Sequence, residues 1–537
     1  MKKLNKYIIV LFSIFSFMSC TDWLDTIPEG GTITDDQKNA AIEANPALLA
    51  ADIAAMNANM IAYMGILGDD YHNDFGYAAA CLYMDSNGAD MTCANTGYNW
   101  FAHNASYADR EYSSTRTLFM WNLFYKQIAS ANIVLASVDP ATDNETLKVY
   151  MGQALAVRAF DYLHLAQLHQ FTYIGHEDAR CVPIVTEKTT AEEASNNPRA
   201  SVKDVYELIM SDLDRSISCL KGYKRKDKGY IDQAVAYGLR ARANLVLNNW
   251  AEAASDADSA LIVSEAIPYT LQQASAPAFY DAATDKNVMW ANMITENNDI
   301  VQSGIINMPS HLCSFYTDGY VGVGAWKKIN RLLFDKINAD DIRKQWWLNE
   351  NEESTLVKTS VYDDWRATAS GDDDFGAYTN VKFGAYKGVD GLKNQTPAQD
   401  WFLMRAEEMI LIKAEGLAMS GKAGEAKTLL ESFVNDYRMV KGKYTAPAGA
   451  TELQEAIWFQ RRIELWGEGF SFFDIMRLKK PITRVENGIS SFPSAWQFNI
   501  EAEAPILLWL VPKSEIEANQ GISEEDNNEK VAPPKAD

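Results

Sequence analysis

The sequence predicts a mainly α-helical protein in which tetratricopeptide-like helix pairs form a scaffold for a loop-rich region with short strands. Apolar residues recur at helical spacing over most of the chain. One long internal segment lacks that spacing and is rich in Gly, Asp, Asn and aromatic residues, which is typical of loops. The helical spacing covers roughly residues 46–67, 115–137, 146–171, 201–220, 232–247, 250–263, 401–420, 423–438 and 451–479.

The amino terminus combines a charged start, a short apolar run and an early cysteine. Three lysines in the first six residues precede the apolar run from Tyr7 to Met18, and the small residue Ser19 precedes Cys20. The run is too short to span a bilayer as a stable helix, and no later segment approaches that length. We therefore expect residues 1–19 to be a lipoprotein signal peptide, Cys20 to be the lipidated first residue and 20–45 a polar tether. The alternative is a thiol in an uncleaved helix.

Two helical stretches are related by a shift of 173 residues, obtained as 426 − 253. Ala241 and Ala253 superpose on Ala414 and Ala426, so each copy has small residues twelve positions apart, at 253 − 241 and 426 − 414. Antiparallel helices that approach closely need small residues at such points, as in tetratricopeptide pairs. Two clear pairs with several degenerate ones predict a short right-handed stack.

The rest of the chain is expected to form one large unit. No Pro/Gly/Ser-rich linker follows the tether, so we expect a single domain over residues 46–537. Its helical scaffold covers about 46–265 and 400–480, and a loop-rich insertion covers about 265–400. The segment 68–108 has the same loop-like composition. Long irregular segments inside compact proteins are usually functional.

The charge of the chain restricts its partners. There are 49 Lys and Arg against 72 Asp and Glu, a net charge of −23. Nucleic acid and anionic lipid surfaces would be repelled, so membrane contact is expected through a lipid anchor alone, and ligands are expected to be neutral or cationic. The cysteines after Cys20 are scattered without a Cys-x-x-Cys pair, which indicates neither zinc nor a disulfide framework, although Cys81 and Cys93 are placed to bridge one loop.

Motifs for catalysis, metals and cofactors are missing. Residues 416–422 nearly spell a phosphate-binding loop, but Ala423 stands where Ser or Thr must hold magnesium, and no strand precedes them. The chain has no His-Glu-x-x-His and no Gly-x-Ser-x-Gly sequence. Asp372, Asp373 and Asp374 are more typical of a solvated charge run than of a calcium loop. A pair of glycosidase carboxylates stays open, because such pairs meet only in space.

Four tracts spread along the chain have a distinctive sequence: CTDWLD at 20–25, RAFDYLHLAQL at 158–168, MRAEEMILIKAE at 404–415 and QRRIELWGEGFSFFDIMR at 460–477. Together they resemble the SusD-like (RagB/SusD) family of outer-membrane nutrient-binding lipoproteins. The resemblance implies a helical tetratricopeptide scaffold with a loop-rich binding face, no catalysis, and partnership with a SusC-like TonB-dependent barrel that the lipoprotein caps at the cell exterior. Family ligands are mostly oligosaccharides, and some members take peptides.

The last of these tracts also has a physical interpretation. Arg461, Glu464 and Glu468 fall at helical spacing among Trp458, Ile463, Leu465 and Trp466. Charges on such an aromatic-lined helix are typical of an ion-pair lock inside the fold, because a reaction centre would need a pocket partner that the sequence does not identify.

Aromatic residues in the two loop regions are the candidate ligand-binding residues. A sugar ring stacks its apolar face on an indole or phenol, while its hydroxyls bond to polar side chains. The first loop supplies Tyr98, Asn99, Trp100 and Asn104, with Asn95 nearby, and the second supplies Tyr316, Tyr320 and Trp326. We expect a non-enzymatic glycan-capturing lipoprotein. The alternatives are a peptide-capturing one, a tetratricopeptide adaptor that grips a protein tail in its groove, and a surface glycosidase.

Overall fold

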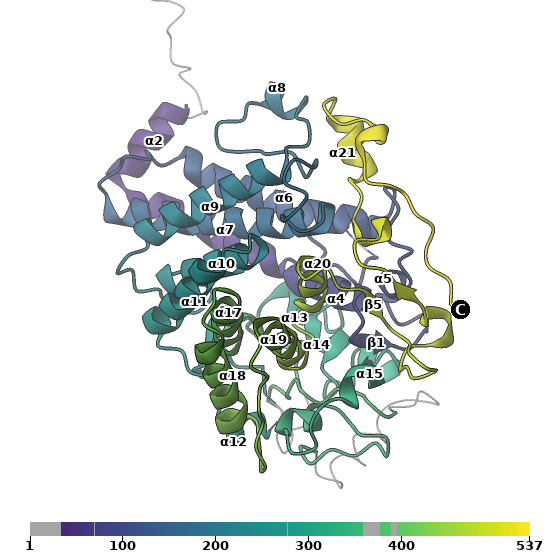
Figure 1. The fold of residues 1–537 in the computed structure, drawn as a ribbon. Helices are drawn as coiled ribbons and strands as arrows, with labels where there is room; N and C mark the ends of the chain where they lie inside the picture. Colours follow the sequence, from purple (N-terminus) through teal and green to yellow (C-terminus); the bar gives the residue numbers. More distant parts are fainter. Residues whose placement is uncertain (1–33, 69, 277, 358–375, 388–394, 537) are drawn as a thin grey trace, which may run out of the picture.

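The computed structural model describes residues 34–68, 70–276, 278–357, 376–387 and 395–536 (Figure 1). Cys20 and the acidic run 372–374 lie outside these ranges, so the lipid anchor and the signal peptide stay predictions. The end of the predicted tether is helical, because Thr34 and Gln37 form a capping box that starts α2 (Asp35–Ala44). No helix in the described ranges is long and apolar enough to cross a membrane.

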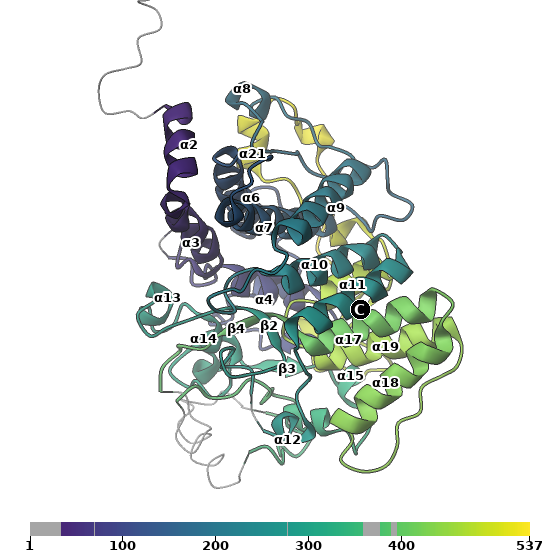
Figure 2. The same ribbon diagram turned by 90° about the vertical axis from the view of Figure 1, so that its left-hand side faces the viewer.

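Long helices form the scaffold, which confirms the mainly α fold class. They pack as a sequential stack in which α6, α7, α9, α10, α11 and α17 each contact the next, and α17 also contacts α18 and α19 (Figures 1 and 2). The long helices are α6 (Thr115–Ala136), α7 (Glu145–His169), α9 (Val202–Cys219), α10 (Gln233–Val246), α11 (Trp250–Ser264), α17 (Ala406–Met419), α18 (Ala423–Tyr437) and α19 (Ala450–Glu464).

The two related stretches are the helix pairs α10–α11 and α17–α18. Ala241, Ala253, Ala414 and Ala426 are all buried where the helices meet. Gly416 lies so close to Trp250 that a Cβ there would collide with its carbonyl oxygen, which explains why the approach requires a glycine. Because Gly416 belongs to this helix contact, residues 416–422 form the end of α17 and a turn.

Three predicted stretches differ from the structure. In 46–67 the helix is limited to α3 (Ala50–Ala58), between 3₁₀ turns at Pro46–Leu49 and Asn59–Ile61. The predicted helix 451–479 is broken after Glu464, because Gly467 and Gly469 adopt positive φ before α20 (Ser471–Arg477). Conversely, the loop region 68–108 contains α4 (Tyr77–Asn87), in which every residue is buried. A fully buried helix has no polar face, so it leaves no periodic signal in the sequence.

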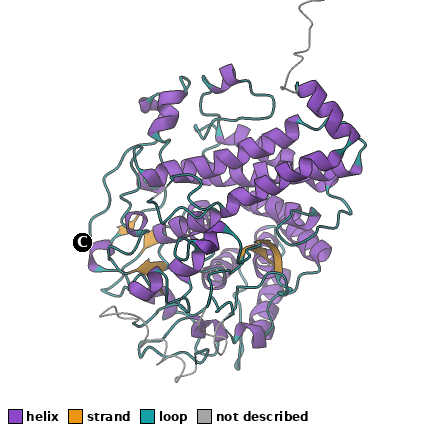
Figure 3. Cartoon of the chain, turned by 180° about the vertical axis from the view of Figure 1, so that it is seen from behind, coloured by secondary structure: helices purple, strands orange, loops and turns teal. Residues whose placement is uncertain are grey.

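Short strands connect the two loop regions. Met91–Cys93 (β1) pairs antiparallel with Lys327–Ile329 (β3), with Cys93 opposite Lys327. The pairing ties the first loop region to the second and places both on one side of the helical stack. Figure 3 shows the few strands lying among loops. The remaining strands pair as β2 (Val288–Asn292) with β4 (Trp401–Arg405) and β5 (Ile482–Thr483) with β6 (Asn499–Ile500).

Short helices complete the loops and the carboxy-terminal segment. They are α5 (Ala102–Ala105), α8 (Ala191–Ala194), α12 (Leu271–Ala274), α13 (Asp299–Gln302), α14 (Met308–Leu312), α15 (Arg331–Phe334) and α21 (Lys513–Ala518), with 3₁₀ turns η4 (Tyr320–Val323), η5 (Ile342–Trp346), η6 (Ser494–Trp496), η7 (Pro505–Leu507) and η8 (Glu524–Asp526). Of these, α5, α14 and η4 carry the residues of the candidate site or lie directly beside them.

Candidate functional site

Three partly exposed rings from the two loop regions meet in what we call the loop aromatic cluster: His72, Trp100 and Tyr320. The His72 and Trp100 rings stack with centroids 4.9 Å apart and an interplanar angle of 17°. Tyr320 stands edge-on to both, with its centroid 5.8 Å from His72 and 6.3 Å from Trp100. The cluster therefore joins residues more than 200 positions apart into one aromatic surface.

A buried layer of rings supports this cluster from below. His311 of α14 stacks on Tyr320 at 4.7 Å and on Phe75 at 5.3 Å, and Phe101 meets His311 edge-on at 5.2 Å. The Nε2–H of His311 donates to the carbonyl oxygen of His72 at 2.9 Å, which fixes the backbone of one loop to the other. Burial lowers the pKa of His311 well below its ordinary value, so the support is uncharged at neutral pH.

Local backbone features set the direction of each loop. The carboxylate of Asp74 accepts hydrogen bonds from the N–H groups of Ile66 and Leu67, at 2.8 and 2.6 Å, and closes the loop that contains His72. Tyr320 reaches over α14 because Gly319 lies against Ser310, where a Cβ would come within 2.5 Å of the Ser310 Cα. The Ser310 hydroxyl also accepts from the Tyr320 N–H at 3.0 Å. These contacts hold the rings in place without a ligand.

The structure divides the predicted ligand-binding residues into a surface group and a buried group. Trp100 and Tyr320 come together in the cluster, and Tyr98, in the same loop as Trp100, is 54% exposed. Asn95 is also exposed. Sequence reasoning missed His72, because a lone histidine in a loop carries no motif that distinguishes it.

Four of the predicted residues are buried, and a side chain without surface cannot stack on a ligand in this conformation. Trp326 is 1% exposed and belongs to the hydrophobic core. Asn99 donates to the Cys93 Sγ and to the Ala94 carbonyl, and Asn104 donates to Asp109 at 2.6 Å. The Tyr316 hydroxyl donates to the Gly304 carbonyl at 2.8 Å. These four side chains shape the loops.

The two cysteines that were placed to bridge one loop are separate, buried thiols. Cys81 lies in α4 against Gly469, whose Cβ would come within 2.8 Å of the Cys81 Sγ. Cys93 lies in β1, where its sulfur accepts the Asn99 amide hydrogen. The bridge that the spacing of Cys81 and Cys93 left open is therefore not formed, because each sulfur packs against a different part of the fold.

The carboxy-terminal charge set forms a buried ion-pair network. Glu464 accepts from Arg343, Arg405 and Arg438, at 3.1, 2.9 and 2.9 Å, and Glu468 accepts from Arg405 and Lys382. Burial alone would raise the pKa of Glu464, but Arg438, Arg405 and Arg343 hold it well below its usual range. The predicted ion-pair lock is confirmed for both glutamates. Its geometry differs, since Arg461 pairs with Asp474 at 2.7 Å.

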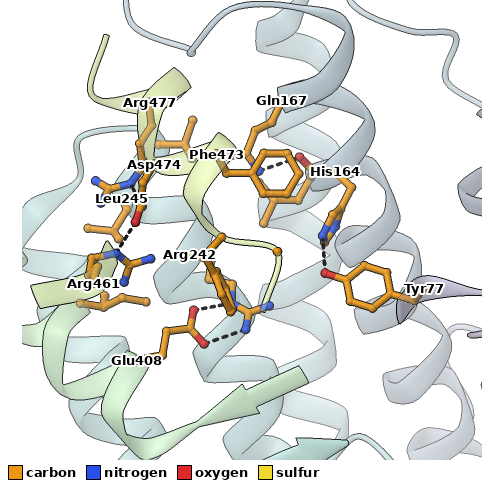
Figure 4. A pocket seen from close by; sticks show the side chains of 15 residues that line it. Tyr77, His164, Gln167, Arg242, Leu245, Glu408, Arg461, Phe473, Asp474 and Arg477 are labelled. Atoms are coloured by element: carbon orange, nitrogen blue, oxygen red, sulfur yellow. Dashed lines mark hydrogen bonds and ion pairs between the residues drawn. The ribbon is translucent and has the colours of Figure 1, made fainter. Parts of the chain in front are cut away.

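A small cavity beside this network is shown in Figure 4. Arg242 holds Glu408 in a bidentate pair at 2.7 Å, and the Tyr77 hydroxyl bonds to Nε2 of His164 at 2.9 Å. Burial lowers the pKa of His164 to about 3, so the ring is neutral. The cavity measures about 40 Å³, which is room for a few water molecules and far too small for a sugar ring. We assign it to the packing of α7, α10 and α17 against α20.

Three open grooves are larger but lack aromatic side chains. The largest, about 840 Å³, lies between the α8 loop and α21 and is lined mainly by hydroxyl, amide and charged groups such as Thr186, Asn196 and Gln520. The other two, about 570 and 550 Å³, lie beside α2 and beside α10–α11. None of these three grooves offers a flat ring for stacking, whereas the loop aromatic cluster does, so we take the cluster as the candidate ligand site. The described residues include no group of three or more side chains suited to hold a metal ion.

Comparisons with known proteins agree with this architecture. A model described as starch-binding associating with outer membrane matches residues 46–245, and a SusD family model matches residues 291–528. A SusD-like protein of Formosa agariphila is 23% identical over 402 residues, which cover 69% of this chain and 74% of that protein.

Solved structures share the fold over nearly the whole chain. A SusD-like carbohydrate binding protein from Bacteroides vulgatus gives a TM-score of 0.69 at 22% identity and covers 90% of this chain and 97% of its own. A SusD superfamily protein from Bacteroides thetaiotaomicron gives a TM-score of 0.65 at 20% identity, with 90% and 99% covered. At these identities the likeness shows the fold alone. The two family models, which together span most of the chain, show that it belongs to the SusD-like (RagB/SusD) family of outer-membrane-associated binding proteins.

Proposed function

We propose that this protein captures oligosaccharides outside the cell on the loop aromatic cluster and delivers them to a SusC-like TonB-dependent transporter in the outer membrane. It acts as a non-enzymatic binding protein anchored through a lipid on Cys20. The observation that carries the proposal is the partly exposed stack of His72 on Trp100, with Tyr320 edge-on beside it. Family membership supports the location and the class of partner.

The cluster has the physical properties that carbohydrate recognition requires. An aromatic ring face stacks on the C–H face of a sugar, and Tyr98 adds a second exposed ring in the Trp100 loop. The buried layer under Tyr320 and the hydrogen bond from His311 to the His72 backbone fix the rings before the ligand arrives. Such preorganisation reduces the entropy that binding must lose, so a few rings suffice for useful affinity.

Replacement of Trp100 tests this site directly. Stacking on an aromatic side chain is worth about 1–3 kcal/mol per base in nucleic-acid complexes, so by analogy Trp100→Ala should weaken binding about tenfold or more. Calorimetry with maltoheptaose, cellohexaose and xylohexaose measures the change. Trp458→Ala is the matched control, because Trp458 is partly buried on α19, outside the cluster, and stacks with Arg462. If Trp100→Ala binds with wild-type affinity, the ligand does not bind at the loop aromatic cluster.

A basic peptide is the second candidate ligand, favoured by the net charge of −23. Salt separates the two ligands, because a stacked neutral sugar has no charge to screen, whereas attraction between a basic peptide and an acidic protein weakens as ionic strength rises. We expect the affinity for the bound oligosaccharide to be nearly the same at low and high salt. If a lysine-rich peptide binds with a steep salt dependence and no oligosaccharide binds, the ligand is a peptide and the glycan proposal is wrong.

A further inference from the structure

We propose that His72 is a specificity-determining residue of this site, and that its Nε2–H donates a hydrogen bond to an oxygen of a neutral sugar lying on the neighbouring rings. The inference rests on the proposed function, which places a ligand on the loop aromatic cluster but gives the imidazole no polar role. It names the chemistry of the ligand more closely: an uncharged ring with an apolar face and an acceptor oxygen at its edge.

The ring of His72 uses one edge for the protein and leaves the other available. Its Nδ1 is hydrogen-bonded to the Tyr320 hydroxyl, and its face is covered by Trp100. Nε2 lies on the opposite edge of the imidazole, and no described residue hydrogen-bonds to it. His72 is partly exposed, and its Nε2 is not among the buried side-chain atoms that lack a partner. A ligand on the rings would therefore meet this nitrogen.

The hydrogen bond to Tyr320 decides which nitrogen of His72 carries the proton. Nδ1 of His72 is hydrogen-bonded to the Tyr320 hydroxyl. A phenol is a strong O–H donor and a weak acceptor, because its oxygen lone pair is delocalised into the ring, whereas an unprotonated imidazole nitrogen is a strong acceptor, so we assign the hydroxyl hydrogen to the bond with Nδ1. Nδ1 is then the acceptor, and the neutral ring carries its hydrogen on Nε2. Tyr320 is thus a positioning residue that fixes the tautomer.

His311 provides an internal contrast within the same stack. Its Nε2–H is also the donor, but it is spent on the carbonyl oxygen of His72 at 2.9 Å, and the ring is fully buried between Phe75 and Tyr320. The two histidines have the same tautomer. Only the donor of His72 has no bond to the described protein, which makes it the one that a ligand can reach.

The donor on His72 is present in both protonation states. The charged and titratable groups that act on the ring are Asp70 of the same segment, Tyr320 of η4 and His311 of α14. Burial lowers the pKa of His72 more than Asp70 raises it, so the ring is neutral at pH 7. Acid adds a proton at Nδ1 and leaves Nε2–H unchanged. Binding of a neutral sugar should therefore persist as the pH falls from 8 to 5, with at most a small gain from the charged donor, whereas a uronate would bind much more tightly as the ring gains charge.

Two substitutions separate the donor from the ring. His72→Gln removes the ring but can place an amide N–H near the position of Nε2, whereas His72→Phe keeps a stacking ring and has no donor. We expect His72→Phe to weaken oligosaccharide binding about tenfold, and His72→Gln to stay closer to wild type, in calorimetry with maltoheptaose, cellohexaose and xylohexaose. A higher affinity in His72→Phe than in His72→Gln would overturn the donor role. Wild-type affinity in His72→Phe together with lost binding in Trp100→Ala would reject this inference and leave the proposed function standing.

A spectroscopic measurement tests the tautomer without any ligand. Long-range ¹H–¹⁵N spectra distinguish Nε2–H from Nδ1–H imidazoles, and wild-type His72 should show the Nε2–H pattern at pH 7.5. Tyr320→Phe removes the hydroxyl that bonds to Nδ1 and should give a mixture of both tautomers. An Nδ1–H pattern in the wild type would overturn the assignment. If the affinity for oligogalacturonate rises at pH 5 and no neutral sugar binds, the ligand is an acidic sugar and the proposal of a neutral one is wrong.

Discussion

The ion-pair network around Glu464 and the loop aromatic cluster are opposite solutions to placing polar groups in one fold. Around Glu464 three arginines surround one buried carboxylate, so these charges pair with one another inside the protein. In the cluster the rings stay partly exposed, and Nε2 of His72 has no partner among the described residues. The comparison teaches that the tract with the strongest sequence signal maintains the fold, whereas the proposed ligand chemistry belongs to loops with weak signals.

The largest expected effect is on the network side of this comparison. Glu464→Gln keeps the size of the side chain but leaves Arg343, Arg405 and Arg438 without their shared negative charge. Loss of one partner from a buried ion pair typically lowers the free energy of unfolding by about 3–5 kcal/mol. Urea denaturation measures the loss, with Glu207→Gln on the surface of α9 as the control that should unfold like wild type. Normal stability combined with lost ligand binding would move the site to the network.

The two tryptophans predicted from sequence should have different effects when they are replaced, one on stability and the other on binding. Trp326→Ala opens a cavity in the core, and such large-to-small changes lower the free energy of unfolding by about 3–5 kcal/mol. Trp100→Ala, at the partly exposed cluster, should change unfolding much less and affect oligosaccharide binding instead. Thermal denaturation and calorimetry on both variants make the comparison. A Trp326→Ala protein with wild-type stability and weakened binding would return that residue to the ligand platform.

The last effect is gradual, and per pH unit the smallest, because it concerns the titration of a carboxyl group that has no arginine partner among the described residues. Burial raises the pKa of Asp85 from 3.8 to about 7, in contrast to Glu464. Between these values the folded protein holds a proton that the unfolded chain releases, so stability falls as pH rises from 4 to 7, by up to about 1.4 kcal/mol per unit. Asp85→Asn retains an acceptor for the Gly469 N–H and should flatten this slope. An unchanged slope, followed by urea midpoints, would show that Asp85 is ionised throughout.

Helix prediction succeeded where helices have two different faces or where the apolar stretch is long. The stretches that became α6, α9, α10, α11 and α18 combine buried residues with exposed or partly exposed ones. The long helix α7 is buried from Met151 to His169, and α17 is buried at most positions, yet both were predicted from apolar stretches too long for a strand. The prediction failed for α4, because all of its residues are buried, and between α19 and α20, where two glycines with positive φ interrupt an apolar pattern. Periodicity reports the contrast between faces, so a helix that is buried on every side is recognised only when its apolar stretch is long, and α4 is short.

The sequence by itself determined the helical scaffold, the acidic charge, the family and the loops in which ligand residues were sought. Only the tertiary structure decided which loop residues reach the surface. The pairing of β1 with β3 brings Trp100 beside Tyr320, and the bond from His311 to the His72 backbone completes the cluster. The same folding buries Trp326 and Asn104. Exposure depends on contacts between residues distant in sequence, and a local pattern carries no information about such contacts.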